Sequence, residues 1–429
     1  LGDNTTGNEN TGLGYKALGS ATGGENTVVG SLSASGAVVT GSGNTSLGRY
    51  NLFSLTSGSY NTAIGHQAGA SISTGDANTV VGKNAGNVIG GGSRNSMLGQ
   101  SAGIKVSSGA DNVAIGYEAL YNVTTTGTNV AIGVNALYDF TGSRVVSIGY
   151  NSGVNLVSDV DCVFMGDHAG YGRTAGTDNT FVGAFSNYSA ATGAGNTGFG
   201  KATGYTLGSG AGNTFVGRQA GYSCQSSGYN TFIGHNAGIY NTGTNNIFLG
   251  SGTGTQSGSV DSGTQNILLG FGTNTATTGD GHCIVISTDQ DVGKGSSTAF
   301  IAPNGGGVYQ DNNTTVWSTT SDERIKKNIV DNNKGLEVID KIQVRNFEYR
   351  TEEEIKDFEN PESAAVKKEG IQLGVIAQEI EKVLPEIVTE ESTGVKSVNA
   401  DNLTWYLVNA VKELKAEVDE LKQNCNCKK

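Results

Sequence analysis

The sequence predicts a mainly β protein, in which a parallel β-solenoid fibre precedes a small α/β domain that ends in a helix. A glycine-closed unit recurs about every 17 residues through the first two thirds of the chain. Charged side chains number 26 in residues 1–320 but 40 in residues 321–429, where the apolar spacing is that of ordinary helices and strands. We therefore expect a solenoid over 1–282, a junction over 283–320 and a separate domain over 321–429.

Composition excludes several classes of protein. Glycine occurs 67 times but proline only three times, and glycine does not fall at every third position, so the chain is not a collagen. A net charge of −12 without a basic stripe argues against nucleic acid as a partner. No run of 18 apolar residues is present, so we expect no membrane insertion. Because Leu1 lies partway into a repeat, we expect more chain to precede it.

The repeated unit reads Asn-Thr-x-aliphatic-Gly, usually followed by x-x-Ala-Gly. Asparagine stands four residues before the glycine in every unit except two, where Val145 and Cys162 replace it. The residue just before the glycine is always apolar, a register that a flexible polar linker would not hold. The sixteen closing glycines are Gly14, Gly30, Gly48, Gly65, Gly82, Gly99, Gly116, Gly133, Gly149, Gly166, Gly183, Gly200, Gly217, Gly234, Gly250 and Gly270.

A unit of this length is too short for a two-helix repeat but suits one coil of a β-solenoid, with two short strands and two turns. The glycine is expected to supply a positive φ or room for a tight turn. The asparagines are expected to stack as a ladder of side-chain amides. The repeated alanine gives a small side chain where backbones approach.

One aliphatic residue per coil buries too little surface to offset the entropy of ordering the whole coil. The residue two before the glycine lies on the opposite face of the strand and is also often apolar, as in Val80, Phe181 and Phe232. One face would then pack inside the coil and the other against neighbouring chains. We therefore expect an obligate oligomer, most simply a homotrimer.

Four units, NTVVGKNAG, NVAIGYEAL, NVAIGVNAL and NTFIGHNAG, carry a resemblance to a known family. They resemble the head repeats of trimeric autotransporter adhesins, and very similar repeats occur in phage and virus tail fibres. The resemblance covers residues 1 to about 275. It implies a trimer of left-handed parallel β-rolls, although the period here is longer than those heads usually show.

The α/β domain is expected to begin with a short helix and strand over 336–349. A strand or turn and a helix should follow over 371–384, because Pro385 stops the helix. A short strand is expected at 386–388, and a final helix over 401–423. That helix carries heptad spacing typical of a small coiled coil, formed by Leu403, Leu407, Ala410, Leu414, Val418 and Leu421.

Ser321 and Lys326 lie five residues apart where the repeats give way to the α/β domain. A serine and a lysine can act as nucleophile and base without a histidine. The lysine must lose its proton to act as a base, which burial favours. Burial that exists only in an assembled trimer would make cleavage a sensor of assembly.

The segments SDERIKKNI, IDKIQVRNFEYR, GVIAQEIEKVLPEIV and NLTWYLVNAVKELK resemble the C-terminal intramolecular chaperone of phage tailspikes and endosialidases, in order and spacing along the whole of 321–429. The resemblance implies a domain that trimerises, aligns the fibre chains and then cuts itself off. It also assigns Ser321 as nucleophile, Lys326 as base and Thr320–Ser321 as the cleaved bond, with support from Asp322, Arg324 and Asn328.

We expect no cofactor and no metal, because His66 and His235 follow repeat glycines at positions typical of turns. Cys425 and Cys427 either link the three chains or form an inert end, and we favour the second. The sequence thus predicts the distal part of a trimeric phage or viral tail fibre, located on the virion, that attaches to a host receptor or glycan. Its only enzymatic activity would be self-cleavage. The alternative is a bacterial cell-surface trimeric adhesin with the same chaperone.

Overall fold

The computed structural model describes residues 3–4, 6–189, 191–255, 261–303, 307–311, 317–319, 321–356, 365–366, 368–391 and 394–426. It divides into two compact units, Leu1–Thr320 and Ser321–Lys429. The first is a parallel β-solenoid and the second a small unit of short strands and helices, so the predicted fold class is confirmed. None of the helices in the described residues is long and apolar enough to cross a membrane.

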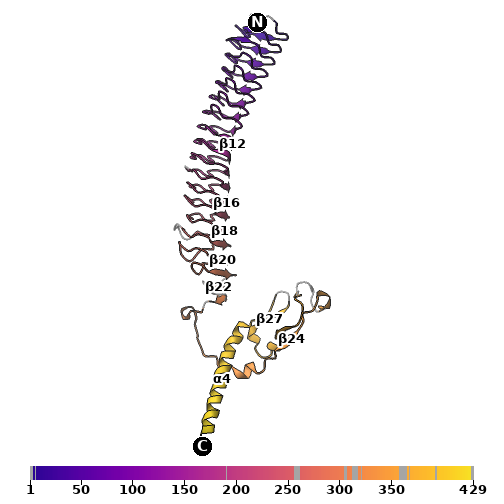
Figure 1. The fold of residues 1–429 in the computed structure, drawn as a ribbon, viewed down its shortest axis with the longest axis vertical. Helices are drawn as coiled ribbons and strands as arrows, with labels where there is room; N and C mark the ends of the chain where they lie inside the picture. Colours follow the sequence, from indigo (N-terminus) through magenta and orange to yellow (C-terminus); the bar gives the residue numbers. More distant parts are fainter. Residues whose placement is uncertain are drawn as a thin grey trace. The chain divides into compact units, whose positions relative to one another are not determined.

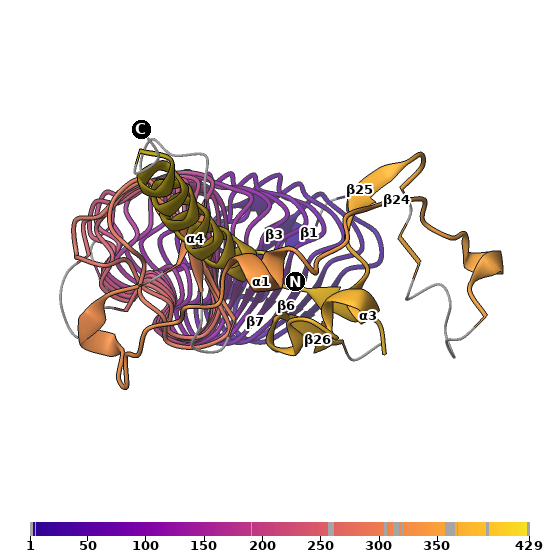
Figure 2. The ribbon, with the colours of Figure 1, turned by 90° about the horizontal axis from the view of Figure 1, so that it is seen from below.

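The solenoid is built on one long parallel ladder, in which each coil contributes a strand that pairs with the strands of the coils before and after it. The coils overlie one another in the end-on view of Figure 2. The strands of the ladder are β2 (Thr11–Leu13), β4 (Thr27–Val29), β6 (Thr45–Leu47), β7 (Thr62–Ile64), β8 (Thr79–Val81), β9 (Ser96–Leu98), β10 (Val113–Ile115), β11 (Val130–Ile132), β12 (Ser143–Ile148), β13 (Val160–Met165), β14 (Thr180–Val182), β15 (Thr197–Phe199), β16 (Thr214–Val216), β17 (Thr231–Ile233), β18 (Ile247–Leu249), β19 (Ile267–Leu269), β20 (Ile284–Ser287) and β21 (Ala299–Ala302).

Beyond β21 the pairing becomes antiparallel, through β22 (Val308–Gln310) and β23 (Trp317–Thr319). A second parallel sheet is described only in the first coils, where it joins β1 (Asp3–Asn4), β3 (Ser20–Ala21) and β5 (Val38–Val39). The expectation of two strands in every coil was therefore wrong. In the later described coils the backbone on that side forms turns and bends in place of a regular strand.

Coils nevertheless remain hydrogen bonded where the second strand is missing. The Gly69 amide donates to the Ala85 carbonyl of the next coil over 2.9 Å. The closing glycines make the close approach of neighbouring coils possible. Gly65 has φ 133°, and a Cβ added to it would lie 2.6 Å from the Gly82 carbonyl oxygen. The predicted role of this glycine is confirmed, because any side chain there would strain the backbone and collide with the next coil.

The core of each coil is filled by the residue two before the glycine, which points inward, and by a partner six residues later. Where the first is Phe215, the second is Gly221, and a Cβ on that glycine would lie 2.5 Å from the phenyl ring. Where the first is Ala114, the partner is Leu120, and both are fully buried. In these two coils a large residue in one position is matched by a small one in the other, which keeps the coil close-packed.

The predicted asparagine ladder is confirmed. The Asn61 side-chain amide donates to the Asn44 side-chain oxygen over 3.1 Å and to the Gly75 carbonyl over 2.8 Å, and its backbone amide donates to the same Asn44 oxygen over 2.9 Å. Each buried amide therefore satisfies backbone groups that the turn would otherwise leave unpaired. The ladder asparagines are Asn26, Asn44, Asn61, Asn78, Asn95, Asn112, Asn129, Asn179, Asn196, Asn213, Asn230, Asn246 and Asn266, and all are buried.

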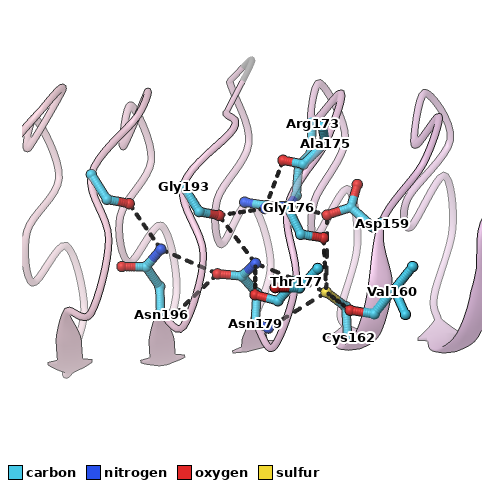
Figure 3. Close-up of polar contacts among 11 residues, drawn as sticks. Asp159, Val160, Cys162, Arg173, Ala175, Gly176, Thr177, Asn179, Gly193 and Asn196 are labelled. Carbon is cyan, nitrogen blue, oxygen red and sulfur yellow. Dashed lines mark hydrogen bonds and ion pairs between the residues drawn. The ribbon is translucent and has the colours of Figure 1, made fainter.

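The ladder is interrupted at Val145 and Cys162, and Figure 3 shows what replaces it near Cys162. The Asn179 backbone amide points at the Cys162 sulfur at 3.4 Å. Beside the sulfur, Arg173 Nε lies 2.6 Å from Asp159 Oδ1, with both side chains completely buried. Arg173 Nη2 also donates to the carbonyl of Gly193, one coil further on, over 2.6 Å. Cys162 thus takes the asparagine's place in the ladder, and a buried ion pair lies beside it.

The C-terminal unit contains short elements before its last helix, in the predicted order over most of its length (Figure 1). Residues 386–388 differ from prediction: Pro385 begins a 3-10 turn that delays the strand to Val388. The elements are η1 (Glu323–Ile325), α1 (Leu336–Ile339), β24 (Arg345–Phe347), η2 (Glu352–Glu354), β25 (Gln372–Gly374), α3 (Ala377–Ile380), η3 (Pro385–Ile387), β26 (Val388–Glu390), β27 (Lys396–Val398) and α4 (Asp401–Asn426).

A small core holds this unit together. Ile380, Leu384 and Ile387 are buried with Tyr406 of α4. Helix α1 is fixed to α4 by the Leu336 backbone amide, which donates to the Glu413 carboxylate over 2.6 Å. The carboxylate accepts an amide hydrogen that the first turn of α1 leaves without a partner in the helix.

Candidate functional site

The candidate site lies at the start of the C-terminal unit, around the single turn η1. Asp322 caps this turn, because its carboxylate accepts a hydrogen bond of 2.8 Å from the backbone amide of Arg324. Lys326 follows at the other end of η1, where its backbone returns to an extended conformation. The tight turn brings residues five apart in sequence back towards each other.

Ser321 and Lys326 meet across this turn. Lys326 Nζ lies 2.7 Å from Ser321 Oγ, within hydrogen-bond distance. A lysine at this distance can accept the hydroxyl proton once the lysine itself is neutral, which leaves an oxygen able to attack a carbonyl carbon. Both side chains are exposed in the single chain. Burial of a lysine disfavours its charged form and so favours the neutral form that can act as a base.

The other predicted site residues lie close to this pair in sequence without joining it. The Arg324 guanidinium lies 2.6 Å from the Asp322 carboxylate, and its hydrogen bonds hold the pKa of that carboxyl below its usual range. Asn328 has a left-handed backbone with φ 55°. In the part of the chain that the structure describes, the Asn328 side chain makes no hydrogen bond to Ser321 or Lys326. Asp322 and Arg324 thus shape the turn.

Two predictions made from the sequence concern residues that the structure does not describe. Thr320, the residue before the predicted cleavage point, lies outside the described residues, as does Cys427. The backbone of Cys425 belongs to α4, but its side chain is not described.

Sequence reasoning missed one further surface, a hollow on the solenoid lined by lysine, arginine and aromatic side chains. Its members include Phe185, Lys201, Tyr205, Arg218 and Tyr222. The sequence does contain an indication of this surface, because no aspartate or glutamate occurs between Asp178 and Asp261.

Comparison with known proteins bears on the C-terminal unit alone. Neither the curated proteins nor the solved structures give a significant match to the chain. Residues 321–389, which begin at Ser321 and include Lys326, match the model of the Peptidase S74 family, described as the chaperone of endosialidase.

Proposed function

We propose that the chain is the distal part of a trimeric phage or viral tail fibre that attaches to a host surface. In this proposal its C-terminal unit aligns three chains and then releases itself by cutting the Thr320–Ser321 bond. The β-solenoid and the match to the chaperone of endosialidase fit such a fibre. The observation that carries the cleavage step is the 2.7 Å contact between Ser321 Oγ and Lys326 Nζ.

An outward stripe of apolar side chains along the ladder supports the trimer. In the ladder strands from β4 to β19 the residue two before the glycine is buried, whereas the residue just before it is partly or fully exposed. Leu47 and Leu98 are each 50% exposed, and Phe199 is 44% exposed. Soluble monomers rarely expose a continuous apolar stripe of this length, because covering it with protein is favourable. Two further copies of the same chain, in register, would cover it.

Helix α4 provides a second apolar surface at the other end of the chain. Leu407, Leu414 and Leu421 repeat every seven residues and are 49%, 44% and 64% exposed. Such a seam is typical of a helix that packs against copies of itself. A short coiled coil would bring three C-terminal units together first, and this would set the register for the solenoid ahead of it. Long-range parallel pairing is slow and prone to slippage, so a device that fixes register is useful.

The proposed cleavage is an acyl shift followed by hydrolysis. Lys326 Nζ takes the proton of Ser321 Oγ, and Oγ attacks the carbonyl carbon of Thr320. The bond from that carbon to the Ser321 nitrogen breaks, the proton passes to this nitrogen, and an ester links Thr320 to Oγ. Water then hydrolyses the ester to a Thr320 carboxylate and restores the serine hydroxyl. Desolvation of Lys326 between assembled chains would couple this chemistry to trimer formation.

The test is a denaturing gel of the expressed chain and its variants. Wild type is expected to release a piece that spans 321–429, which is about a quarter of the 44.0 kDa chain. Ser321→Ala and Lys326→Ala should abolish release, whereas Lys327→Ala, the exposed neighbouring lysine, should not change it. A whole but trimeric wild type would remove the catalytic assignment of Ser321 and leave the unit as a permanent assembly cap.

A second pair of variants tests the link to assembly. Leu414→Glu with Leu421→Glu places charge in the proposed seam of α4 and should yield monomers that stay uncut. The matched substitution Lys415→Glu lies on the charged side of the same helix and should leave both trimer and cleavage intact. Efficient cleavage of the monomeric double variant would contradict the proposal that assembly activates the pair.

A further inference from the structure

The part of the solenoid from β14 to β18 differs in charge from the rest of the chain. The stretch between Asp178 and Asp261 contains no carboxylate side chain, although the whole chain carries a net charge of −12. Lys201 and Arg218 follow the closing glycines of two successive coils, and His235 follows the next. Because coils repeat at strand spacing, about 4.8 Å, these three side chains form a short column along the fibre. This column is a local positive feature on an acidic protein.

An aromatic column runs beside the positive one. Tyr171, Tyr188, Tyr205 and Tyr222 stack one coil apart, with ring centroids 5.0, 5.0 and 4.7 Å apart and ring planes within 13° of parallel. Stacking covers the electron-rich faces of the rings within the column. The ring edges, which carry partial positive charge, and the phenol hydroxyls remain available to a ligand.

A hollow lies between the two columns. In the coil before it, the ring of Phe185 stacks on His168, with centroids 5.4 Å apart. The next coil has Ala202 at the equivalent position, so a ring is replaced by a methyl group. The resulting hollow has a volume of about 340 Å³ and is lined by Lys201, Arg218 and the two tyrosines Tyr205 and Tyr222 among others. That volume is near the lower end of the range for small-molecule sites, about 300–1,000 Å³.

We propose that this hollow binds an acidic polysaccharide, a saccharide chain that bears carboxylate or sulfate groups. The two cations and the positive ring edges attract oxyanions, and the phenol hydroxyls can donate to and accept from sugar hydroxyls. The proposal deepens the proposed function, since it rests on a fibre that meets a host surface, and it names the ligand class and its place.

Backbone pairing favours a saccharide over an acidic peptide. A peptide would gain most of its affinity by adding a strand to free backbone groups. Around the hollow these groups are already engaged between coils. The amides of Ala202, Gln219 and Thr206 donate to the carbonyls of Ala184, Lys201 and Tyr222 over 2.9 Å each. Recognition is therefore left to side chains, which suits a ligand whose polar groups are hydroxyls and oxyanions.

The experiment measures binding of the intact chain to four immobilised probes: polygalacturonate, dextran sulfate, neutral dextran and poly-L-glutamate. Wild type should bind the first two and not the last two. The double variant Lys201→Gln, Arg218→Gln should weaken binding by about tenfold or more, because two charge-assisted contacts are lost. Ala202→Phe, which continues the neighbouring ring stack into the hollow, should weaken it similarly without removing charge.

Lys83→Gln is the matched control, because Lys83 follows a closing glycine in a coil outside the hollow. It should change binding less than about twofold. Equal binding of poly-L-glutamate would overturn the saccharide assignment in favour of an acidic peptide or of charge alone. Unchanged binding by both hollow variants, or no binding of either acidic polysaccharide, would overturn the site.

Failure of this inference is separable from failure of the proposed function. Release of the C-terminal piece and trimer formation are read on gels and do not involve Lys201, Ala202 or Arg218. A fibre that trimerises, cleaves itself and adsorbs to its host while binding neither acidic probe would overturn only the proposal that the hollow binds an acidic polysaccharide. A chain that binds the probes but neither trimerises nor cleaves would overturn the proposed fibre function. It would leave the proposed polysaccharide site unaffected.

Discussion

The regular coils of the solenoid and its irregular coils satisfy buried backbone groups in different ways. In a regular coil a neutral asparagine side chain links three coils, as Asn196 does through Asn179 and Gly210. In the described residues the buried charged side chains are instead Asp159, Arg173, Asp261 and Asp280, and none of them lies in the regular ladder. The first two flank the ladder break at Cys162, and Asp261 lies in the unusually long step between Gly250 and Gly270.

This difference shows what the repeat contributes physically. An amide can be copied from coil to coil because it is neutral and carries both a donor and an acceptor. Near the break at Cys162 a longer charged side chain, Arg173, reaches the next coil, and its charge is paired with Asp159 inside the solenoid. Loss of one buried polar side chain from an irregular coil should therefore destabilise the solenoid far more than loss of an exposed polar side chain.

The largest effect is expected from Asp159→Ala. It leaves the fully buried Arg173 without its partner at 2.6 Å, and an uncompensated buried charge of this kind costs about 3–5 kcal/mol. Because solenoids open locally, the loss should appear as faster hydrogen exchange of amides in the coils around 159–193. Distant coils such as those before residue 100 should keep their protection.

Asp111→Ala provides the matched control. Asp111 lies 2.6 Å from Arg94, the same separation as in the buried pair, but the two side chains are 44% and 62% exposed. Water screens such a pair, so the substitution should leave exchange rates unchanged within error. Equal effects of Asp159→Ala and Asp111→Ala would show that burial of the first pair has no energetic consequence, and the contrast between coil types would fail.

A smaller loss is expected from Asn196→Ala in a regular coil. The substitution removes the acceptor of the Asn213 backbone amide and the donor to the Gly210 carbonyl. Each buried group left unpaired costs at least about 1 kcal/mol, so a loss of roughly 2 kcal/mol or more is expected. Asn122→Ala removes an asparagine whose contacts to Lys105 and Asp139 are at the surface, and it should cost less than about 0.5 kcal/mol. Local hydrogen exchange measures the loss of stability in both variants. Equal losses would show that a ladder asparagine stabilises the solenoid no more than a surface asparagine does.

Much of the solenoid could be predicted from the sequence because its constraints are local and repeated. The closing glycine, the amide ladder and the strand before each glycine all follow from a fixed register. The direction of the two apolar faces did not follow, because Val80 and Val81 are chemically alike and only the curvature of the coil decides which points inward. The buried pair was also missed. Arg173 and Asp159 occupy no repeated position, and their contact depends on how the break at Cys162 is packed.

The candidate site was predictable in a different way. The order of motifs in the C-terminal unit located Ser321 and Lys326, and the turn capped by Asp322 accounts for their approach in the structure. The surroundings that would make Lys326 a base were not predictable, because in the proposed assembly they would be supplied by other chains. The hollow beside Lys201 was missed because it arises from a missing ring at Ala202 and from missing carboxylates, and motif searches look for residues that are present.

The smallest change in stability, and the only gain, is expected from Asp261→Asn. Burial raises the pKa of this carboxyl from 3.8 to about 6. Between about pH 4 and pH 6 the folded chain therefore binds more protons than the unfolded chain, so stability rises as the pH falls through this window. Asparagine keeps an oxygen that can accept the 2.9 Å hydrogen bond from the Gly263 amide but carries no charge to bury.

The variant should therefore be more stable than wild type at pH 7, by on the order of 1–3 kcal/mol, and equal to it near pH 4. Hydrogen exchange of the coils around Asp261, followed from pH 4 to pH 7 with the intrinsic exchange rate corrected, measures the difference. Asp76→Asn, at an exposed turn of a regular coil, should leave the pH profile unchanged. A profile of Asp261→Asn that parallels wild type would mean that Asp261 is not the group that titrates, and that this irregular coil bears no cost for its buried charge.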